Sequence, residues 1–379
     1  MVRLMKILMI LSKEFIVDPR VYREAKSLVA DGNQVTVISW DRSHKNEHNG
    51  VIDGINVISL YNTKGMKLLP NDILRNPFWW RAAYKKGVQL YKDDFQFEVV
   101  HCHDLDTLQT GVWLKKKLGV KLIYDAHEIF VYMIERSAPK AVVRFANRME
   151  RRLLNEVDYV ITVDDGYAEY FRNITSKPLT IVRNCKDLIG DYQPPSHQLF
   201  TLTYIGTLNH SRFFPEILDV IGKIQNVQFI IIAKKENILY DEIKELAQAY
   251  KNIKFFDPIP TSKVLSVTLE GHVVVCLFDP TKKLNRIGSP NKLFEAMVTG
   301  RPIIVTKGTH AGDIVEREQC GVSVDYSMEG LEKAIVLLRD NPVLCEQLGR
   351  NGLKAAKSEF NWSKQEAQLF SVYQQIKAE

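Results

Sequence analysis

Short runs of apolar residues alternate with amphipathic helical segments along both halves of the chain. In the first half the apolar runs cover residues 7–11, 34–39, 99–102, 121–124 and 159–163. In the second half they cover residues 202–205, 228–232, 253–256, 273–277 and 302–306. Short apolar runs separated by helices are typical of parallel strands that are buried on both faces. The pattern therefore predicts an α/β protein with two doubly wound, Rossmann-like sheets.

A polar segment separates the two halves. Residues 184–196 are mostly polar and contain Pro194 and Pro195, and the alternation of strands and helices resumes at residue 200. We expect a first domain at residues 1–187, a linker at 188–199 and a second domain at 200–358. The remaining residues, 359–379, have the pattern of an amphipathic helix.

Composition and charge narrow the class of protein. The 379 residues suffice for two domains at roughly 100–200 residues each, and 45% apolar and 25% charged residues are ordinary for a globular protein. The net charge of +6 favours an anionic ligand or surface but does not indicate nucleic acid. Five scattered cysteines without a C-x-x-C pair predict reduced thiols in a cytoplasmic protein. No segment approaches the ~20 apolar residues of a membrane-spanning helix.

Residues 288–306, "GSPNKLFEAMVTGRPIIVT", predict a helix followed by a buried strand. Ser289 suits the helix cap, Pro290 its first turn and Gly300 its left-handed end. These signals account for the start and the end of the helix, but they do not explain why Glu295 lies inside it. The backbone N–H groups of Asn291 and Lys292 lie at the positive end of the helix, which suits an anionic ligand.

Polar residue types gather where predicted strands end, which is where parallel sheets bind ligands. They follow the strands as residues 12–24, 101–104, 125–128, 206–212 and 257–260. Loops at the opposite ends, such as residues 30–33 and 117–120, contain ordinary turn residues.

Seven segments, in this order, resemble a known family. They are "DPRVYREAKSLVADGNQVTVI", "VVHCHDLDTL", "YDAHE", "VRNCKD", "YIGTL", "SPNKLFEAMVTGRPII" and "NWSKQEAQLFSVYQQI". The chain resembles glycosyltransferases of the GT-B fold, of the retaining family-4 type. The resemblance implies two facing Rossmann-like domains, with a C-terminal helix that crosses back to the first. It also implies a hexosyltransferase type of enzyme that moves a sugar from a UDP- or GDP-sugar to a glycan or lipid-linked acceptor, in cell-envelope or surface polysaccharide synthesis.

The resemblance assigns the sugar-nucleotide donor mainly to the second domain. It implies that Glu295 accepts hydrogen bonds from the ribose and that Arg212 neutralises the leaving phosphate. Read singly, each residue favours the plainer interpretation, Glu295 as a solvated helix residue and Arg212 as a surface charge, and only the two together in this order favour a functional one. The other donor residues implied are Gly206, Ile259 at the base, Ile287 at the sugar, and the amides of Asn291 and Lys292 at the diphosphate. Two departures stand out: Ile287 occupies a position where the family often has Glu, and Thr207 one where it has Arg.

In the first domain the resemblance implies a catalytic role for His127, which would orient the donor sugar and stabilise developing charge. The acceptor side would hold His103, Glu128, Asp18 and Arg20. Asp18 and Arg20 are equally explained as a turn and a helix N-terminus. A histidine at a strand end is also often structural.

The pair His101-x-His103 invites a metal interpretation, because alternate strand residues share a face. The surrounding sequence lacks the further Asp and His of a hydrolase metal motif, and transfer on this fold needs no metal. We therefore expect neither metal nor cofactor.

Basic residues beside aromatics at 76–92, and a basic segment at 140–152, suggest an anionic membrane surface at the cytoplasmic face. A core aromatic cluster with solvated helix faces explains them equally well. Two other functions fit the fold: a sugar-nucleotide 2-epimerase, and a non-catalytic sugar-nucleotide-binding partner.

Overall fold

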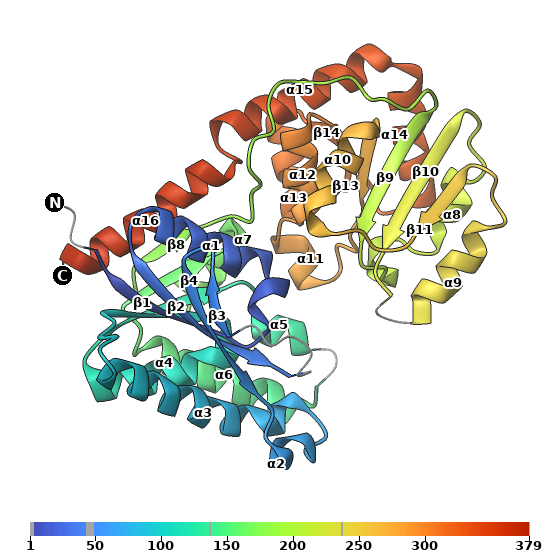
Figure 1. Cartoon of the computed structure of the whole chain (residues 1–379). Coiled ribbons are helices and arrows are strands. Elements are labelled where there is room, and N and C mark those ends of the chain that lie inside the picture. The colour runs from blue at the N-terminus through green and yellow to red at the C-terminus, as the bar shows by residue number, and fades with distance from the viewer. Residues whose placement is uncertain (1–3, 43–48, 136–137, 236–237, 379) are drawn as a thin grey trace. The chain divides into compact units, whose positions relative to one another are not determined.

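The computed structural model describes residues 4–42, 49–135, 138–235 and 238–378. The chain divides into two compact units, each of which is a sheet covered by helices (Figure 1). The first unit comprises Met1–Val182 and Glu366–Glu379, and the second comprises Arg183–Gln365. The α/β class predicted from the apolar pattern is confirmed.

The sheet of the first unit has eight strands in the order β3-β4-β2-β1-β5-β6-β7-β8. Every pairing is parallel except the β3–β4 hairpin. The strands are β1 (Lys6–Leu11), β2 (Gln34–Asp41), β3 (Gly50–Ile52), β4 (Ile55–Tyr61), β5 (Val99–His103), β6 (Lys121–Ala126), β7 (Tyr159–Thr162) and β8 (Leu179–Ile181). The five strands predicted in this half are all present. The apolar pattern missed β3, β4 and β8, which lie toward the edges of the sheet and are only partly buried.

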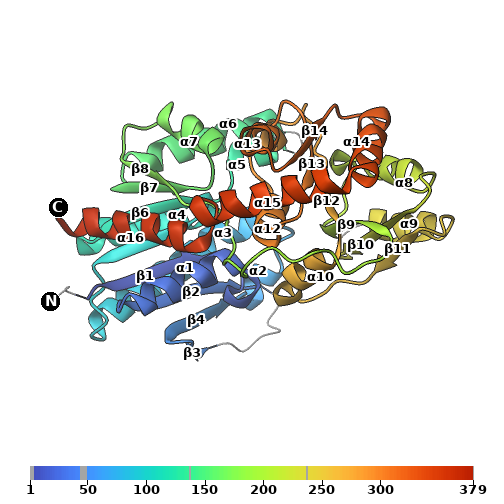
Figure 2. The ribbon, with the colours of Figure 1, turned by 90° about the horizontal axis from the view of Figure 1, so that it is seen from above.

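Helices cover both faces of this sheet. They are α1 (Pro19–Ala30), α2 (Lys64–Lys67), α3 (Asp72–Lys92), α4 (Leu105–Leu118), α5 (Phe130–Ile134), α6 (Lys140–Leu154) and α7 (Asp165–Arg172), with a 3-10 turn η1 (Phe15–Val17). Figure 1 shows α3 and α4 on one face and α1 on the other. The C-terminal helix α16 (Trp362–Ala378) begins in the second unit and ends in the first. It runs across the sheet on the side of α1 (Figure 2).

The sheet of the second unit has six parallel strands in the order β11-β10-β9-β12-β13-β14. They are β9 (Phe200–Gly206), β10 (Val227–Ala233), β11 (Ile253–Phe256), β12 (Val273–Cys276), β13 (Ile303–Thr306) and β14 (Gly321–Val324). The order reverses between β9 and β12, and the carboxyl ends of strands at such a reversal are where this architecture binds ligands. The five predicted strands are present, and the edge strand β14 was not predicted.

The helices of this unit form two layers with separate apolar cores. They are α8 (Glu216–Ile221), α9 (Ile238–Ala247), α10 (Val264–Glu270), α11 (Lys283–Ile287), α12 (Asn291–Thr299), α13 (His310–Glu318), α14 (Met328–Asp340) and α15 (Pro342–Ser358), with 3-10 turns η2 (His210–Arg212) and η3 (Thr261–Lys263). One core packs α8, α9 and α14 on the sheet, and the other packs α12, α13 and α15.

Helix α12 corrects one detail of the sequence interpretation. Ser289 was expected to cap it, but the N-cap position is Pro290, whose backbone is extended at φ −71° and ψ 147°. Gly300 ends the helix in the left-handed conformation at φ 65°, as expected. The helix therefore begins at Asn291, so the first two amides without an intrahelical partner are those of Asn291 and Lys292.

Candidate functional site

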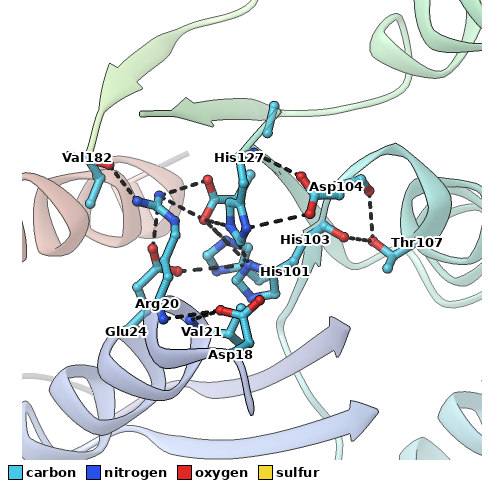
Figure 3. A network of polar contacts seen from close by, with 12 residues as sticks. Asp18, Arg20, Val21, Glu24, His101, His103, Asp104, Thr107, His127 and Val182 are labelled. Atoms are coloured by element: carbon cyan, nitrogen blue, oxygen red, sulfur yellow. Dashed lines mark hydrogen bonds and ion pairs between the residues drawn. The ribbon is translucent and has the colours of Figure 1, made fainter. Parts of the chain in front are cut away.

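A buried cluster of charged and polar side chains lies where β5 and β6 of the first unit end. Figure 3 shows Arg20 and Glu24 on α1 reaching toward His101, His103 and His127. Arg20, Glu24, His101 and His103 are each at most 3% exposed. Because buried polar groups are costly unless they are paired, the cluster must be held by specific contacts.

Arg20 lies at the centre of these contacts. Its Nη2 atom lies 3.0 Å from Asp125 Oδ1 and 3.2 Å from Asp125 Oδ2, and also 3.0 Å from Glu24 Oε1. Its Nη1 atom donates to the carbonyl oxygen of Val182 at 2.7 Å. Asp18 caps α1 by accepting hydrogen bonds from the amides of Arg20 and Val21, both at 3.1 Å. These contacts fix Arg20 and Asp18 inside the fold, and contact of either with an acceptor stays a prediction.

Three imidazole rings surround one oxygen of Asp125. The Oδ2 atom lies 3.1 Å from His127 Nε2 and 3.5 Å from both His101 Nε2 and His103 Nδ1. Burial alone would raise the pKa of Asp125, but Arg20 and His127 outweigh it and hold that pKa well below its ordinary value. Asp125 is therefore a fixed negative charge beside the histidines.

The three histidines differ in charge. Burial lowers the pKa of His101, and burial together with His101 lowers the pKa of His103 to about 3. Burial would also lower the pKa of His127, but the carboxylates of Asp104 and Asp125 outweigh it and raise that pKa to about 9. At neutral pH His127 is consequently an imidazolium, which cannot accept a proton as a general base.

Asp104 holds His127 in place from the other side. Its Oδ1 atom accepts the backbone N–H of His127 at 3.0 Å, and its Oδ2 atom lies 3.6 Å from His127 Nδ1. Asp104 adopts a positive φ of 63°, which is uncommon outside glycine and is often found at functional sites. The His127 side chain is 12% exposed, so part of the ring is accessible.

The cluster also contains four groups of the kind that bind metal ions. One ligand atom each from Glu24, His101, His103 and Asp125 lies within 4.8 Å of the others. The guanidinium of Arg20 already lies 3.0 Å from both carboxylates of this set. Arg20 thus supplies a positive charge beside both acids of this set.

Two further residues of the first unit were predicted to contact an acceptor, and the structure buries one and exposes the other. His103 is fully buried, and its Nδ1 atom lies 3.3 Å from His127 Nε2. Glu128 is exposed and accepts a hydrogen bond from the hydroxyl of Tyr167 at 3.4 Å. The sequence interpretation missed the roles of Glu24 and Asp125, although Asp125 belongs to one of the strand-end segments it singled out.

In the second unit two basic side chains converge at the end of β9. Gly206 ends this strand with φ +150°, and a Cβ atom there would lie 2.7 Å from Lys292 Nζ and 3.9 Å from Arg212 Nη1. Lys292 is only 8% exposed, and its Nζ lies 4.4 Å from the centre of the Tyr204 ring. Arg212 donates to the carbonyl oxygen of Thr207 at 2.9 Å. The backbone conformation favours glycine here, and a side chain would displace the lysine head.

Glu295 lies one helical turn beyond Asn291 on α12. It is 9% exposed, and its Oε1 atom lies 3.2 Å from Lys186 Nζ. Lys186, which is itself 8% exposed, was not singled out by the sequence interpretation. Its contact shows that Glu295 is not a solvated surface residue.

The other predicted donor residues lie on separate segments of this unit. Ile287 ends α11 and is half-buried, and Asn291 is exposed at the start of α12. Ile259 is half-buried in the loop between β11 and η3. The structure brings together Gly206, Arg212 and Lys292. The roles of Ile259 and Ile287 stay predictions.

The fold is similar to those of several solved structures. Sucrose-phosphate synthase from Thermosynechococcus elongatus has a TM-score of 0.79 and 17% identity, over 98% of this chain and 99% of that one. A glycosyltransferase from Rickettsia africae ESF-5 has a TM-score of 0.76 and 12% identity, over 98% of both chains. Anabaena Alr3699/HepE in complex with UDP-glucose has a TM-score of 0.73 and 14% identity, over 97% of this chain and 99% of that one. This architecture is the GT-B fold.

Two family models match the chain in succession. Glycosyltransferase Family 4 matches residues 18–188, and Glycosyl transferases group 1 matches residues 200–341. The chain belongs to the GT-B glycosyltransferases, so the resemblance inferred from the sequence motifs is confirmed. YtcC of Bacillus subtilis (strain 168), which is named as a glycosyltransferase, is 27% identical over 144 residues, covering 37% of this chain and 34% of that protein. The match thus spans about a third of this relative's length.

Within the described ranges, no helix combines the length and the apolar character needed to cross a membrane. Two helices had been considered for a membrane surface. On α3, Trp79 is 1% exposed and stacks on Trp40 with ring centres 5.2 Å apart. This aromatic residue therefore belongs to the core. On α6, by contrast, Phe145 is 66% exposed and has exposed Arg144 and Arg148 beside it.

Proposed function

We propose that the protein is a retaining glycosyltransferase that uses a UDP- or GDP-sugar as its donor. The observation that carries this proposal is the convergence of Lys292 and Arg212 at Gly206, where β9 ends beside the reversal of strand order. Two fixed cations at such an end suit a diphosphate. The amide groups at the start of α12 add partial positive charge.

Lys292 offers a physical answer to one departure from the family pattern. Thr207 stands where the family has an arginine, so one cation is missing from the end of β9. The Lys292 ammonium lies close to Gly206, the residue before Thr207, and supplies a positive charge there. Its side chain, in addition to its amide, is thus proposed to bind the diphosphate.

The remaining roles follow from charge and burial. Glu295, held by Lys186, is proposed to accept hydrogen bonds from the ribose hydroxyls. His127, as an imidazolium, is proposed to stabilise negative charge and orient a bound sugar. The leaving phosphate is proposed to take the acceptor proton, with Lys292 and Arg212 neutralising its charge, so the proposed reaction includes neither a metal nor a cofactor. The solved structure of HepE in complex with UDP-glucose, on the same fold, supports a nucleotide-sugar donor.

The acceptor is proposed to be a glycan or a lipid-linked sugar, in the synthesis of envelope or surface polysaccharide. The exposed Phe145 between arginines on α6 supports a peripheral position on an anionic membrane, since each basic residue near such a surface contributes about 1 kcal/mol. Flotation with anionic vesicles at low salt tests this position. Co-migration that is lost in Phe145→Ser supports it, and failure of the wild type to float removes the membrane from the account.

Calorimetry with UDP and GDP tests the donor site. A charge-assisted hydrogen bond is worth about 1.5–3 kcal/mol, so Lys292→Ala and Arg212→Ala should each weaken binding about tenfold or more. Lys333→Ala is the matched control, because Lys333 lies in the same unit but pairs with Glu329 on the surface of α14. Unchanged affinity in both site variants would contradict the assignment.

A further inference from the structure

Helix α16 places one hydroxyl group against the histidine cluster. The hydroxyl of Tyr373 lies 2.7 Å from His101 Nδ1. Tyr373 is 4% exposed and His101 is 0% exposed, so water does not compete freely for this contact. The two residues are 272 positions apart in sequence, and no motif linked them.

The contact determines which nitrogen of His101 carries the proton. Burial lowers the pKa of His101, so the ring is neutral and has one N–H group. Its Nε2 atom lies 3.5 Å from Asp125 Oδ2, which is longer than a normal hydrogen bond, but the negative charge of this oxygen repels a nitrogen lone pair and attracts an N–H group. We therefore assign the hydrogen to Nε2, which leaves Nδ1 as the acceptor. Burial also raises the pKa of Tyr373 far above its ordinary value, so its hydroxyl keeps the proton that it donates to Nδ1.

The same carboxylate oxygen reaches His127. Asp125 Oδ2 lies 3.1 Å from His127 Nε2, so His101 and His127 share one acceptor. We propose that Tyr373 is a positioning residue that fixes the tautomer of His101 and, through Asp125, the charge and orientation of His127. This inference rests on the function proposed above for His127.

Several charged and titratable groups act on His127 besides this chain of contacts. They are Asp104 and Asp125 beside the ring, Arg20, Asp18 and Glu24 from α1 and its cap, His103 from β5, and Glu128 in the following loop. Glu24 and Asp125 also interact electrostatically with the Tyr373 side chain. The hydroxyl is hydrogen-bonded to His101, so a change in the His101 tautomer that accompanies a shift of His127 identifies His101 and Asp125 as the route.

Removal of the Tyr373 hydroxyl should shift the pKa of His127 in one direction. Without a donor to Nδ1, His101 can move its proton to that nitrogen, and the Nε2 lone pair then faces Asp125 Oδ2. Asp125 loses a polar N–H partner and depends more on the positive charge of His127. In Tyr373→Phe the pKa of His127 should consequently rise, by about half a unit.

The experiment is a histidine NMR titration of the full-length protein with ¹⁵N-labelled imidazole rings, without any substrate. The His101 and His127 signals are assigned by their loss in His101→Gln and His127→Gln. Tyr159→Phe is the matched control, because its hydroxyl contacts Gln375 of the same helix at 3.1 Å but does not contact His101.

In the wild type, His101 should show the tautomer protonated at Nε2. In Tyr373→Phe the tautomer should become mixed and the His127 titration should move to higher pH, whereas Tyr159→Phe should leave both unchanged. A wild-type His101 protonated at Nδ1 overturns the inference even if Tyr373→Phe fails to fold. An unchanged His127 titration in a folded Tyr373→Phe also overturns it. Because no substrate is present, a failed transferase assay would be a separate result.

Discussion

The Arg20 guanidinium and the Asp125 carboxylate form a buried ion pair, with Nη2 lying 3.0 Å from Oδ1 and 3.2 Å from Oδ2. The pair joins α1 to the end of β6 across 105 positions of sequence. It supplies the positive charge that makes a buried carboxylate beside three histidines tolerable. Much of the charge pattern around His127 depends on this contact.

Replacement of Arg20 by methionine should destabilise the protein strongly. Removing one partner of a buried pair leaves the other charge uncompensated and costs about 3–5 kcal/mol. Denaturant unfolding measures the loss. The control is Lys26→Met, which removes an exposed partner of Asp53 from the same helix and should have little effect. Equal stability of the two variants would show that the buried pair contributes no more than a surface pair.

Stability should fall as pH rises through the alkaline range, and His127 should account for part of the fall. Its pKa is raised from 6.5 to about 9, so the folded state holds a proton that the unfolded state releases earlier. Its stabilisation is fully present below pH 6.5 and is lost as pH rises through about 9. Burial raises the pKa of Glu24 to about 8, which acts in the same direction.

The measurement is the free energy of unfolding of wild type and His127→Gln at several pH values. The wild type should lose on the order of 1–3 kcal/mol more than the variant between pH 6.5 and about 9.5. Parallel pH profiles for the two proteins would mean that His127 is not protonated in the folded state near neutral pH.

The strands that carry the site could be predicted from sequence because they are buried on both faces. β1 contains a continuous apolar run and β9 is buried from Thr201 to Tyr204, whereas the missed β4 alternates buried and half-buried residues and β14 is half-buried at an edge. Gly300 was recognised because the left-handed end of a helix favours glycine. Apolar pattern and backbone chemistry are local properties, so the sequence shows them directly.

The site contacts that were missed are not local. Nothing in the sequence near Asp125 indicates that Arg20 neutralises it or that Tyr373 contacts the adjacent His101. Lys292 was predicted through its amide, but the structure also brings its side chain to Gly206. Side chains on a helix point toward its N-terminus, and a lysine in the first turn therefore extends beyond the helix end. That rule, applied to α12, is the signal that could have revealed the second cation.

Gly206→Ala should weaken UDP or GDP binding without unfolding the protein. The added Cβ atom would lie 2.7 Å from Lys292 Nζ. The backbone φ of +150° at this position is also unfavourable for alanine. The flexible lysine end would move away from the strand end, and one phosphate contact would be lost. Calorimetry should show a loss of about tenfold, similar to that of Lys292→Ala. If Gly206→Ala bound UDP and GDP with the affinity of the wild type, the diphosphate would not bind beside Gly206.

Ile287 should influence the choice of donor sugar. An isoleucine cannot accept a hydrogen bond, and a buried sugar hydroxyl left unpaired against it costs roughly 1–3 kcal/mol. A sugar with a deoxy or N-acetyl group at that position avoids the cost, as does one held by the backbone amides of Gly288 and Ser289. Wild type and Ile287→Glu are compared across UDP- and GDP-sugars. Identical preferences would mean that Ile287 only packs.

The most direct test of the proposed reaction is the anomeric configuration of its product. The protein is incubated with UDP- and GDP-hexoses and a panel of glycan and lipid-linked acceptors, with EDTA present, and the new bond is assigned by NMR. The account predicts that nucleoside diphosphate is released with acceptor, that EDTA does not reduce the release, and that the product keeps the donor's anomeric configuration. Inversion at the anomeric carbon, or an epimerised sugar formed without any acceptor, would contradict it.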